Sequence, residues 1–305
     1  MTEFSPAILK VERAAREALE ASLMHLGGEP VGTIAARDDR PEPLNYHHCF
    51  TRDFAVSAIV FLLTSRADIV RNFLTTLVEL HSRDRSMDCF QPGRGLMPAS
   101  FVVRRTSGQE QVVADFGEHA IARVTPVDSG FWWLVLLRAY TRTTGDEELA
   151  GQPAFQDAIR LIVDRSLETT YEMLPTLLVP DGAFMIDRRM GVYGHPLEVQ
   201  ALFFAGLRAA RELLPPDDTY QAPVAERLGL LLHHVRTYYW VDLAGLDRIN
   251  RYPVEEYGQD IQNRFNIQPD SIPSWLPPWL PDEGGYLAGN LGPGRMDFRF
   301  FSQGN

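Results

Sequence analysis

Apolar residues recur at three- and four-residue spacing in three stretches of the chain, and this spacing places them on one face of a helix. The stretches cover residues 67–82, 155–167 and 224–239. We therefore predict three amphipathic helices, each with one buried face. In the first stretch this face consists of Ile69, Val70, Phe73, Leu74, Leu77 and Val78.

Three further stretches, at about 53–64, 127–140 and 196–210, are apolar on most sides, which is typical of buried helices. Another helix is expected near 6–24, so that about seven helices precede residue 240. Few alternating patterns compete as strands. Buried helices that alternate with one-sided helices are what a two-layer toroid would give, with inner helices enclosed and outer helices facing water. The pattern predicts an all-α fold.

Composition and charge exclude several classes of protein. Forty acidic and 29 basic residues give a net charge of −11, which argues against a nucleic-acid or anionic-membrane partner. The longest apolar stretches are far shorter than the roughly 20 residues that cross a bilayer. The N-terminus lacks the pattern of a secretory signal, and only Cys49 and Cys89 could form a disulfide. We expect a cytoplasmic protein.

Common sequence signatures of cofactor, metal and nucleophile chemistry are missing. There is no GxGxxG or GxxxxGKS loop for a nucleotide, and no GxSxG nucleophile elbow. The histidines are scattered and the cysteines lack CxxC spacing, so no metal site is predicted. We expect the protein to use neither a cofactor nor a metal.

Two loops before apolar helices combine carboxylates with arginine or tryptophan. Arg52 and Asp53 lie at the start of the helix near 53–64. Either Asp53 caps this helix and pairs with Arg52, or both hydrogen-bond the hydroxyl groups of a polyol. Asp128 marks the start of the next apolar helix and is followed by Trp132. It is either only an N-cap or part of a sugar site, for which carboxylates beside aromatic rings are the usual components.

The third cluster surrounds Asp187, which is followed by two arginines. Neighbouring arginines would lower the pKa of this carboxyl group and favour an ion pair, whereas a general acid needs a raised pKa. The residues alone leave these two interpretations open. Glu198, in the first turn of the next helix, is either a capping residue favoured by the helix dipole or part of the same site.

Long stretches of the chain from about residue 43 to its end closely resemble the neutral and alkaline invertases of plants and cyanobacteria, glycoside hydrolase family 100. The resemblance implies an (α/α)6 toroid that hydrolyses sucrose to glucose and fructose with inversion and without a cofactor. The matching stretches are 52–54, 92–101, 115–118, 126–133, 185–191, 195–198, 255–257, 266–275, 284–291 and 296–301.

The resemblance also implies roles for the clustered residues. Asp187 corresponds to the general acid, and Asp181, on a Pro-Asp-Gly turn six residues earlier, is the alternative acid. The residues expected to hold the sugar, by their positions in the motifs, are Arg52, Asp53, Asp128, Trp132, Arg189, His195 and Glu198.

The chain departs from the family pattern at its C-terminal end. The family's general base is implied to be the glutamate of a Trp-Pro-Glu motif, and this chain contains no such motif. A smaller departure is His119, where a small hydroxyl residue is expected. Residues 1–305 are therefore expected to form a single toroid domain that is truncated at its C-terminal end. Three or four helices would be absent, which would leave inner helices with an exposed apolar flank that favours association.

Three interpretations of function follow. The first is a sucrose-cleaving enzyme, with this sequence a truncated or incompletely recorded form. The second is an inactive short paralogue that binds a sugar or a partner subunit. In the third, the chain docks with a separately encoded C-terminal piece. The expected ligand is sucrose or a related small sugar, and a homo-oligomer is plausible for this family.

Overall fold

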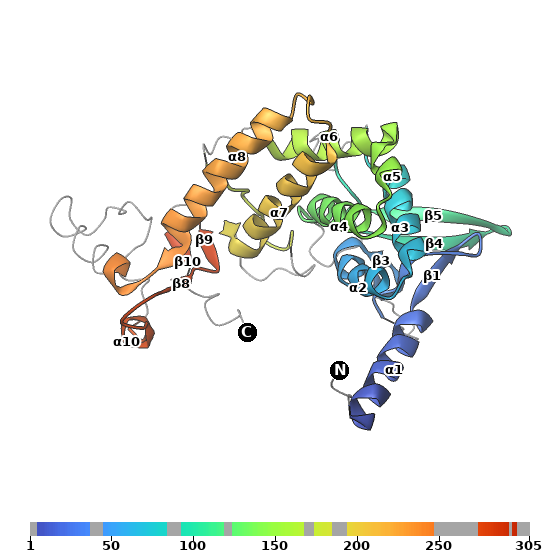
Figure 1. The fold of residues 1–305 in the computed structure, drawn as a ribbon, viewed down its shortest axis with the longest axis horizontal. Coiled ribbons are helices and arrows are strands. Elements are labelled where there is room, and N and C mark those ends of the chain that lie inside the picture. The colour runs from blue at the N-terminus through green and yellow to red at the C-terminus, as the bar shows by residue number, and fades with distance from the viewer. Residues whose placement is uncertain are drawn as a thin grey trace.

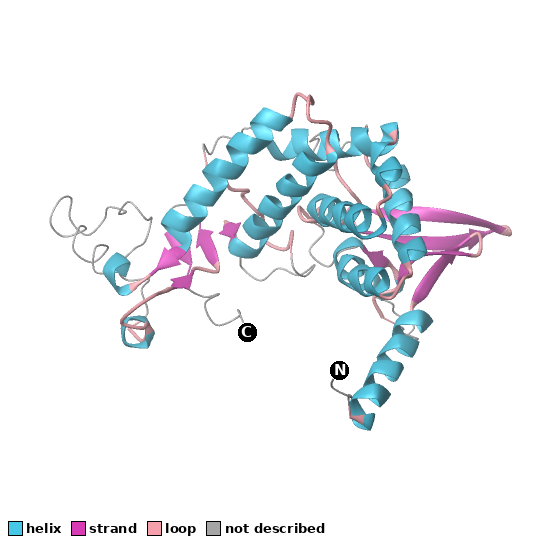
Figure 2. Ribbon diagram, in the orientation of Figure 1, coloured by secondary structure: helices cyan, strands magenta, loops and turns pink. Residues whose placement is uncertain are grey.

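A computed structural model describes residues 5–36, 45–83, 93–118, 124–167, 174–184, 194–246, 274–292 and 295–297 of the chain. This part is mostly helical with small antiparallel sheets (Figure 2). All seven predicted helices are present, and two short helices, α5 and α10, were not predicted. The helices are α1 (Pro6–Ala21), α2 (Thr51–Leu63), α3 (Ala67–Leu80), α4 (Ser129–Thr144), α5 (Glu147–Gly151), α6 (Pro153–Leu167), α7 (Leu197–Leu213), α8 (Gln221–His234) and α10 (Leu276–Trp279).

The long helices after α1 form two layers. In one layer α4 packs between α2 and α7, and in the other α3, α6 and α8 lie against them. Inner and outer helices alternate along the chain in this arrangement, although α2, predicted to be buried, is buried on one face only. The described elements form an arc and do not close into a ring (Figure 1). No described helix has the length and apolar character needed to span a membrane.

The core lies between the two layers. All six residues of the predicted apolar face of α3 are buried, as the spacing indicated. The inner helices α4 and α7 approach closely at Gly206, where a Cβ atom would lie 2.8 Å from Cδ1 of Phe131. This contact fixes the spacing of two helices whose first turns, as described below, contribute to the candidate site.

The expectation of few strands is wrong for the first half of the chain. The predicted helix near 6–24 ends at Ala21, and a hairpin of β1 (Leu23–Leu26) and β2 (Glu29–Thr33) follows it. A second hairpin joins β4 (Ser100–Thr106) to β5 (Gln109–Asp115), and β3 (Cys49–Phe50) pairs with β4.

The hairpin of β4 and β5 carries no alternating pattern because it leaves the body of the protein (Figure 1). The first residues of β4 are buried on both sides, and the last ones are exposed on both sides. Its turn uses positive φ angles at Ser107 and Gly108, a conformation that glycine adopts without strain. The alternation that reveals a half-buried strand is therefore missing here.

The segment after residue 240, predicted to be loop-like, contains short strands that return to the body. β7 (Trp240–Val241) follows a π-helical turn at Val235–Tyr239 and pairs with β8 (Tyr286–Leu287). β9 (Asn290–Gly292) lies between β10 (Arg295–Asp297) and β6 (His195–Pro196), the strand that precedes α7.

A buried glutamine attaches the segment before residue 184 to α7. The side chain of Gln200 accepts a hydrogen bond from the backbone N–H of Leu177 at 2.8 Å and donates one to its carbonyl oxygen at 2.9 Å. Two residues later, Val179 forms a β-bridge with Gly194. These contacts hold residues 177–179 beside the start of α7.

Helix α2 was predicted to be buried, but only one of its faces is. Phe54, Ala58 and Phe61 pack in the core. The opposite face is exposed because no described element covers it. This face, which we call the α2 stripe, has spacing i, i+3, i+4 and i+7 and consists of Val56, Ile59, Val60 and Leu63. It matches the expected exposed apolar flank.

Candidate active site

The first turns of the three inner helices converge. Arg52 in the first turn of α2 donates a hydrogen bond from Nη1 to Oδ2 of Asp128, the N-cap residue of α4, at 2.7 Å. Glu198, in the first turn of α7, interacts electrostatically with both of them. The partial positive charge at each helix N-terminus favours the carboxylates gathered there. We call Arg52, Asp128 and Glu198 the carboxylate–arginine cluster.

The side chain of Asp128 pairs with Arg52 and does not cap its helix. It occupies the N-cap position of α4, but its side chain accepts no capping hydrogen bond and pairs with Arg52 instead. The residue is 2% exposed, and its Oδ1 is buried without a hydrogen-bond donor among the described residues. A buried carboxylate oxygen of this kind can accept a hydrogen bond from a bound hydroxyl group.

The charges of the cluster influence one another. Loss of water around the Glu198 carboxyl group, together with the negative charge of Asp128, raises the pKa of Glu198 above its ordinary value. The positive charge of Arg52 opposes this rise. Burial disfavours the charged form of Arg52, but Asp128 outweighs this effect, and the pKa of Arg52 is raised. The guanidinium group therefore stays charged.

Two other predicted sugar-binding residues lie beside the cluster. The Asp53 side chain is 56% exposed, and its Oδ1 lies 4.0 Å from Nε of Arg52. Trp132 is half-buried in the first turn of α4, and its Nε1 has no hydrogen-bond acceptor in the described part of the chain. The roles of both residues in holding a sugar stay predictions.

Neighbouring loops hold the cluster in place. Thr51, which begins α2, donates from its backbone N–H to the carbonyl of Ala99 and from Oγ1 to that of Pro98. The N–H of Val127, just before α4, donates to the carbonyl of Ala183 at 3.0 Å. The bond between Val127 and Ala183 brings the Pro180–Ala183 turn, which contains Asp181, next to the start of α4.

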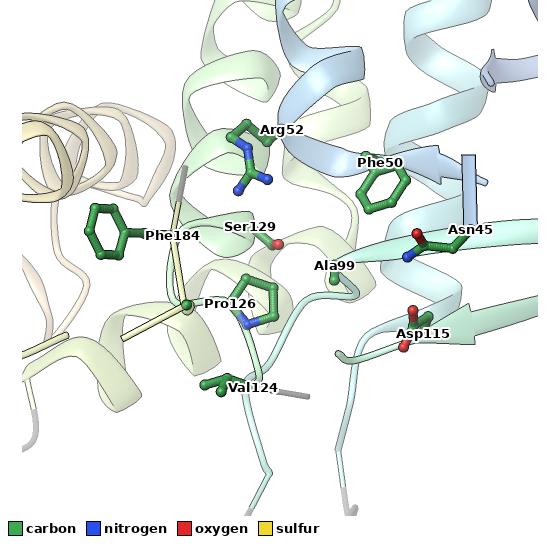
Figure 3. A pocket seen from close by; sticks show the side chains of 10 residues that line it. Asn45, Phe50, Arg52, Ala99, Asp115, Val124, Pro126, Ser129 and Phe184 are labelled. Atoms are coloured by element: carbon green, nitrogen blue, oxygen red, sulfur yellow. The ribbon is translucent and has the colours of Figure 1, made fainter. Parts of the chain in front are cut away.

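A small pocket lies beside the cluster and includes Arg52 in its wall. Figure 3 shows the guanidinium group of Arg52 and the Ser129 hydroxyl directed into this space, with Phe184 on one side and Asn45 on the other. The pocket combines apolar rings with hydrogen-bonding groups. Its wall consists of Asn45, Phe50, Arg52, Ala99, Asp115, Val124, Pro126, Ser129, Gly182 and Phe184.

Of the remaining predicted residues, the structure describes only His195. Asp187 and Arg189 lie outside the described residues, as does His119. His195 is 3% exposed, and its carbonyl oxygen accepts a hydrogen bond from the Tyr239 hydroxyl at 2.6 Å. Its role in holding a sugar stays a prediction. Within the described ranges, no three side chains of the His, Cys, Asp or Glu type are grouped so as to hold a metal ion.

Of the ten residues in the pocket wall, only Arg52 was predicted to hold the sugar, and the residues that were missed include Asn45, Phe50 and Phe184. Asn45 and Phe50 belong to the loop that contains Arg52, and Phe184 follows the Asp181 turn. The signal that could have identified them is this proximity in sequence to charged residues at helix starts. Only the fold shows that these residues line the same pocket.

Comparison with known proteins finds a family model and relatives that all carry the name invertase. The sequence model of the family described as alkaline and neutral invertase matches residues 15–305. Neutral/alkaline invertase 1, mitochondrial, from Oryza sativa subsp. japonica is 50% identical over 306 residues, which cover 96% of this chain and 49% of the relative. Neutral/alkaline invertase 3, chloroplastic, from the same plant is 49% identical, with 97% and 50% covered.

Cytosolic invertase 1 of the same plant is 50% identical over 295 residues, which cover 95% of this chain and 52% of the relative. The chain thus spans about half the length of the curated relatives it matches. Their names place them in mitochondria, chloroplasts and the cytosol. The similarity therefore selects no compartment, and a cytoplasmic location stays a prediction.

One solved structure that is similar to this chain is a metal-independent alpha mannosidase from Streptococcus pneumoniae in complex with alpha-1,6-mannobiose. It is 14% identical, with a TM-score of 0.47, and the match covers 76% of this chain and 58% of that one. A likeness of this size does not establish a closed toroid.

Proposed function

Because the chain belongs to the family of alkaline and neutral invertases, we propose that it serves the hydrolysis of sucrose to glucose and fructose. The observation that carries this proposal is the identity of about one half with named invertases over nearly the whole chain. No comparison favours the competing interpretation, an inactive paralogue that only binds a sugar, over hydrolysis.

The proposed reaction proceeds with inversion. Asp187 donates a proton to the glycosidic oxygen, and fructose leaves as the bond to the glucosyl carbon breaks. A water molecule attacks that carbon from the opposite face and gives its proton to a second carboxylate. In inverting enzymes the two carboxyl groups lie about 6.5 to 9.5 Å apart, which leaves room for the water. The released glucose is therefore the β-anomer.

The carboxylate–arginine cluster supports a role in holding the sugar. Oδ1 of Asp128 is a buried acceptor without a donor among the described residues, and Arg52 offers further N–H groups beside it. Glu198 contributes a second carboxyl group, and Trp132 contributes an apolar surface. Sugar hydroxyl groups need such paired donors and acceptors, and the ring carbons need an apolar face. Asp53, Arg189 and His195 complete the proposed set of sugar-binding residues.

The finer description of the fold is part of the same proposal. The two layers of helices are consistent with paired helices of an (α/α)6 toroid, in a single domain that contains all the described elements. In such a toroid the first turns of the inner helices line the mouth, as those of α2, α4 and α7 would here. Association into a homo-oligomer stays a prediction.

The test is hydrolysis of sucrose by the purified protein, followed by proton NMR to identify the first glucose anomer. We expect β-glucose to appear first and to convert slowly to the α-anomer. Initial release of α-glucose would contradict inversion, since it requires a retaining mechanism. A folded protein that binds sucrose without cleaving it would contradict the hydrolase proposal. The Asp187→Asn variant controls for contaminating activity.

A further inference from the structure

Gln200 is fully buried, and both polar atoms of its side chain bind the backbone of one other residue. Its Oε1 accepts a hydrogen bond from the N–H of Leu177 at 2.8 Å, and its Nε2 donates one to the Leu177 carbonyl oxygen at 2.9 Å. The residue is 0% exposed. The backbone at Leu177 therefore cannot move relative to α7 without breaking both bonds.

The first turn of α7, which contains Gln200, also contributes to the carboxylate–arginine cluster. Glu198, two positions before Gln200, interacts there with Arg52 and Asp128. Val199, between them, is buried in a small apolar core together with Val179, Ala183 and Phe184. Three consecutive residues thus connect the proposed sugar-binding cluster to the segment 177–184.

This segment leads to both carboxyl groups considered for the general acid. Asp181 lies in it, on the turn that follows Val179. Asp187 belongs to the residues between Phe184 and Gly194, which are the described residues nearest to it on either side. The position of the segment therefore bears on the acid, whichever of the two aspartates is used.

Backbone hydrogen bonds fix the segment at two further points. The N–H of Val179 donates to the carbonyl of Gly194 at 2.7 Å, and the N–H of Gly194 donates back to the carbonyl of Val179 at 3.2 Å. The carbonyl of Ala183 accepts from the N–H of Val127 at 3.0 Å. The contact of Gln200 differs from these because it depends on a side chain, so a substitution can remove it.

The position of a general acid matters because it acts only within hydrogen-bond reach of the oxygen that it protonates. A displacement of about 1 Å can lower the rate about a hundredfold. In the proposed reaction the first turns of the inner helices hold the sugar, and the segment after Leu177 carries the acid. A residue that joins the two sets the distance between the acid and the glycosidic oxygen.

We propose that Gln200 is a positioning residue, whose two hydrogen bonds to Leu177 hold the acid-bearing segment in place beside the proposed sugar-binding cluster. The inference rests on the proposed function, since it concerns the protonation step of that reaction. Gln200 acts through the acid, so its removal should weaken protonation of the leaving group more than any other step.

The test compares two substrates of the Gln200→Met variant, whose unbranched, flexible side chain makes neither bond. Sucrose and α-D-glucosyl fluoride both react at the glucosyl carbon, but fluoride leaves with the bonding electrons and needs no proton from an acid. We expect kcat for sucrose to fall about tenfold or more, because the acid is displaced. The kcat for glucosyl fluoride should stay within about twofold of wild type.

The matched control is Gln156→Met in α6. Gln156 is also buried, and its Nε2 donates to the carbonyls of Ala150 at 2.8 Å and Leu213 at 3.0 Å. Leu213 is at the end of α7 opposite to Glu198. This variant therefore loses two comparable bonds away from the cluster, and the ratio of the two kcat values should equal that of wild type.

An equal loss for both substrates with Gln200→Met, or no loss for either, would overturn the inference. Such a result with an active wild type leaves the proposed function intact, whereas a wild type that cleaves neither substrate would overturn both. If the methionine variant does not fold, Gln200→Glu carries the same comparison. Ionised glutamate keeps the acceptor and loses only the donor, so we expect a smaller loss that is again confined to sucrose. Circular dichroism of each variant establishes folding before the kinetics are compared.

Discussion

The guanidinium group of Arg52 and the carboxylate of Asp128 form an ion pair across 2.7 Å, although 76 residues separate them in the sequence. The pair joins the first turn of α2 to the N-cap of α4. It therefore fixes the relative position of two helices and also holds the Arg52 side chain in the wall of the pocket.

Replacement of Arg52 by methionine should destabilise the protein, because it leaves the Asp128 carboxylate buried without its counter-charge. We expect the free energy of unfolding to fall by about 2 to 4 kcal/mol. The double variant with Asp128→Asn should recover part of this loss, since the buried charge is then removed as well. Urea unfolding of the four proteins in this cycle measures the effect. Additive losses would contradict the pairing.

Asp187→Asn should abolish most of the activity while leaving the protein folded, because asparagine cannot donate a proton to the glycosidic oxygen. We expect kcat to fall at least about a hundredfold. Asp181→Asn is the matched control, since this residue lies on the turn six positions earlier and is the alternative acid. If the loss is found for Asp181→Asn and not for Asp187→Asn, the assignment is reversed.

The raised pKa of Glu198 should make stability depend on pH in a definite direction. The folded protein holds this proton more firmly than the unfolded chain, whose carboxyl group titrates near 4.5. The stabilisation is present below that pH and is lost as the pH rises through the raised pKa. The stability of Glu198→Gln relative to wild type should therefore increase from about pH 4 to about pH 7. Urea unfolding across this range measures the difference, and a constant value would contradict the assignment.

Gly206→Ala should separate α4 from α7, because the added Cβ atom would lie 2.8 Å from Phe131. We expect a loss of about 1 to 3 kcal/mol in stability, together with reduced activity as the helix starts move apart. Gly229→Ala in α8 is the matched control, because no atom lies within 4 Å of its new Cβ. That variant should gain about 0.5 to 1 kcal/mol from helix propensity. Similar thermal unfolding of the two variants would contradict the close contact.

The α2 stripe should promote association of the purified chain. Replacing its two most exposed residues, as Val56→Glu with Leu63→Lys, breaks the apolar surface without changing the net charge. We expect the average mass in light scattering to fall, with a change in stability within about 0.5 kcal/mol. Leu230→Lys, at one of the two exposed leucines of α8, should have no such effect. An unchanged mass would show that the stripe does not mediate association.

The helices could be predicted from the sequence because their burial is periodic. All six predicted face residues of α3 are buried, since one side of this helix faces the core along its whole length. The hairpin of β4 and β5 could not be predicted, because its burial changes along the strand rather than from side to side. The exposed face of α2 has the same apolar residue pattern as a buried face. Only the arrangement of the other elements shows that it is uncovered.

The candidate site was predictable in its parts but not in its connections. Arg52, Asp128 and Glu198 could each be placed before an apolar helix, but the sequence left open whether Asp128 was only a cap. The structure shows its carboxylate paired with Arg52, a choice that depends on how α2 and α4 pack. The sequence showed Asn45 only as part of the loop before Arg52, because burial without a hydrogen-bond partner is a property of the whole fold.

The two hydrogen bonds between Gln200 and the backbone of Leu177 limit sequence variation unequally at the two positions. Position 177 contributes only its main chain to them, which any residue except proline can supply. Position 200 must supply a donor and an acceptor at the same reach. Asparagine is one methylene group too short, and ionised glutamate cannot donate. We therefore expect any residue except proline to keep these two bonds at 177, where packing of the partly buried side chain against the core favours apolar residues, whereas every replacement of Gln200 loses at least one of them.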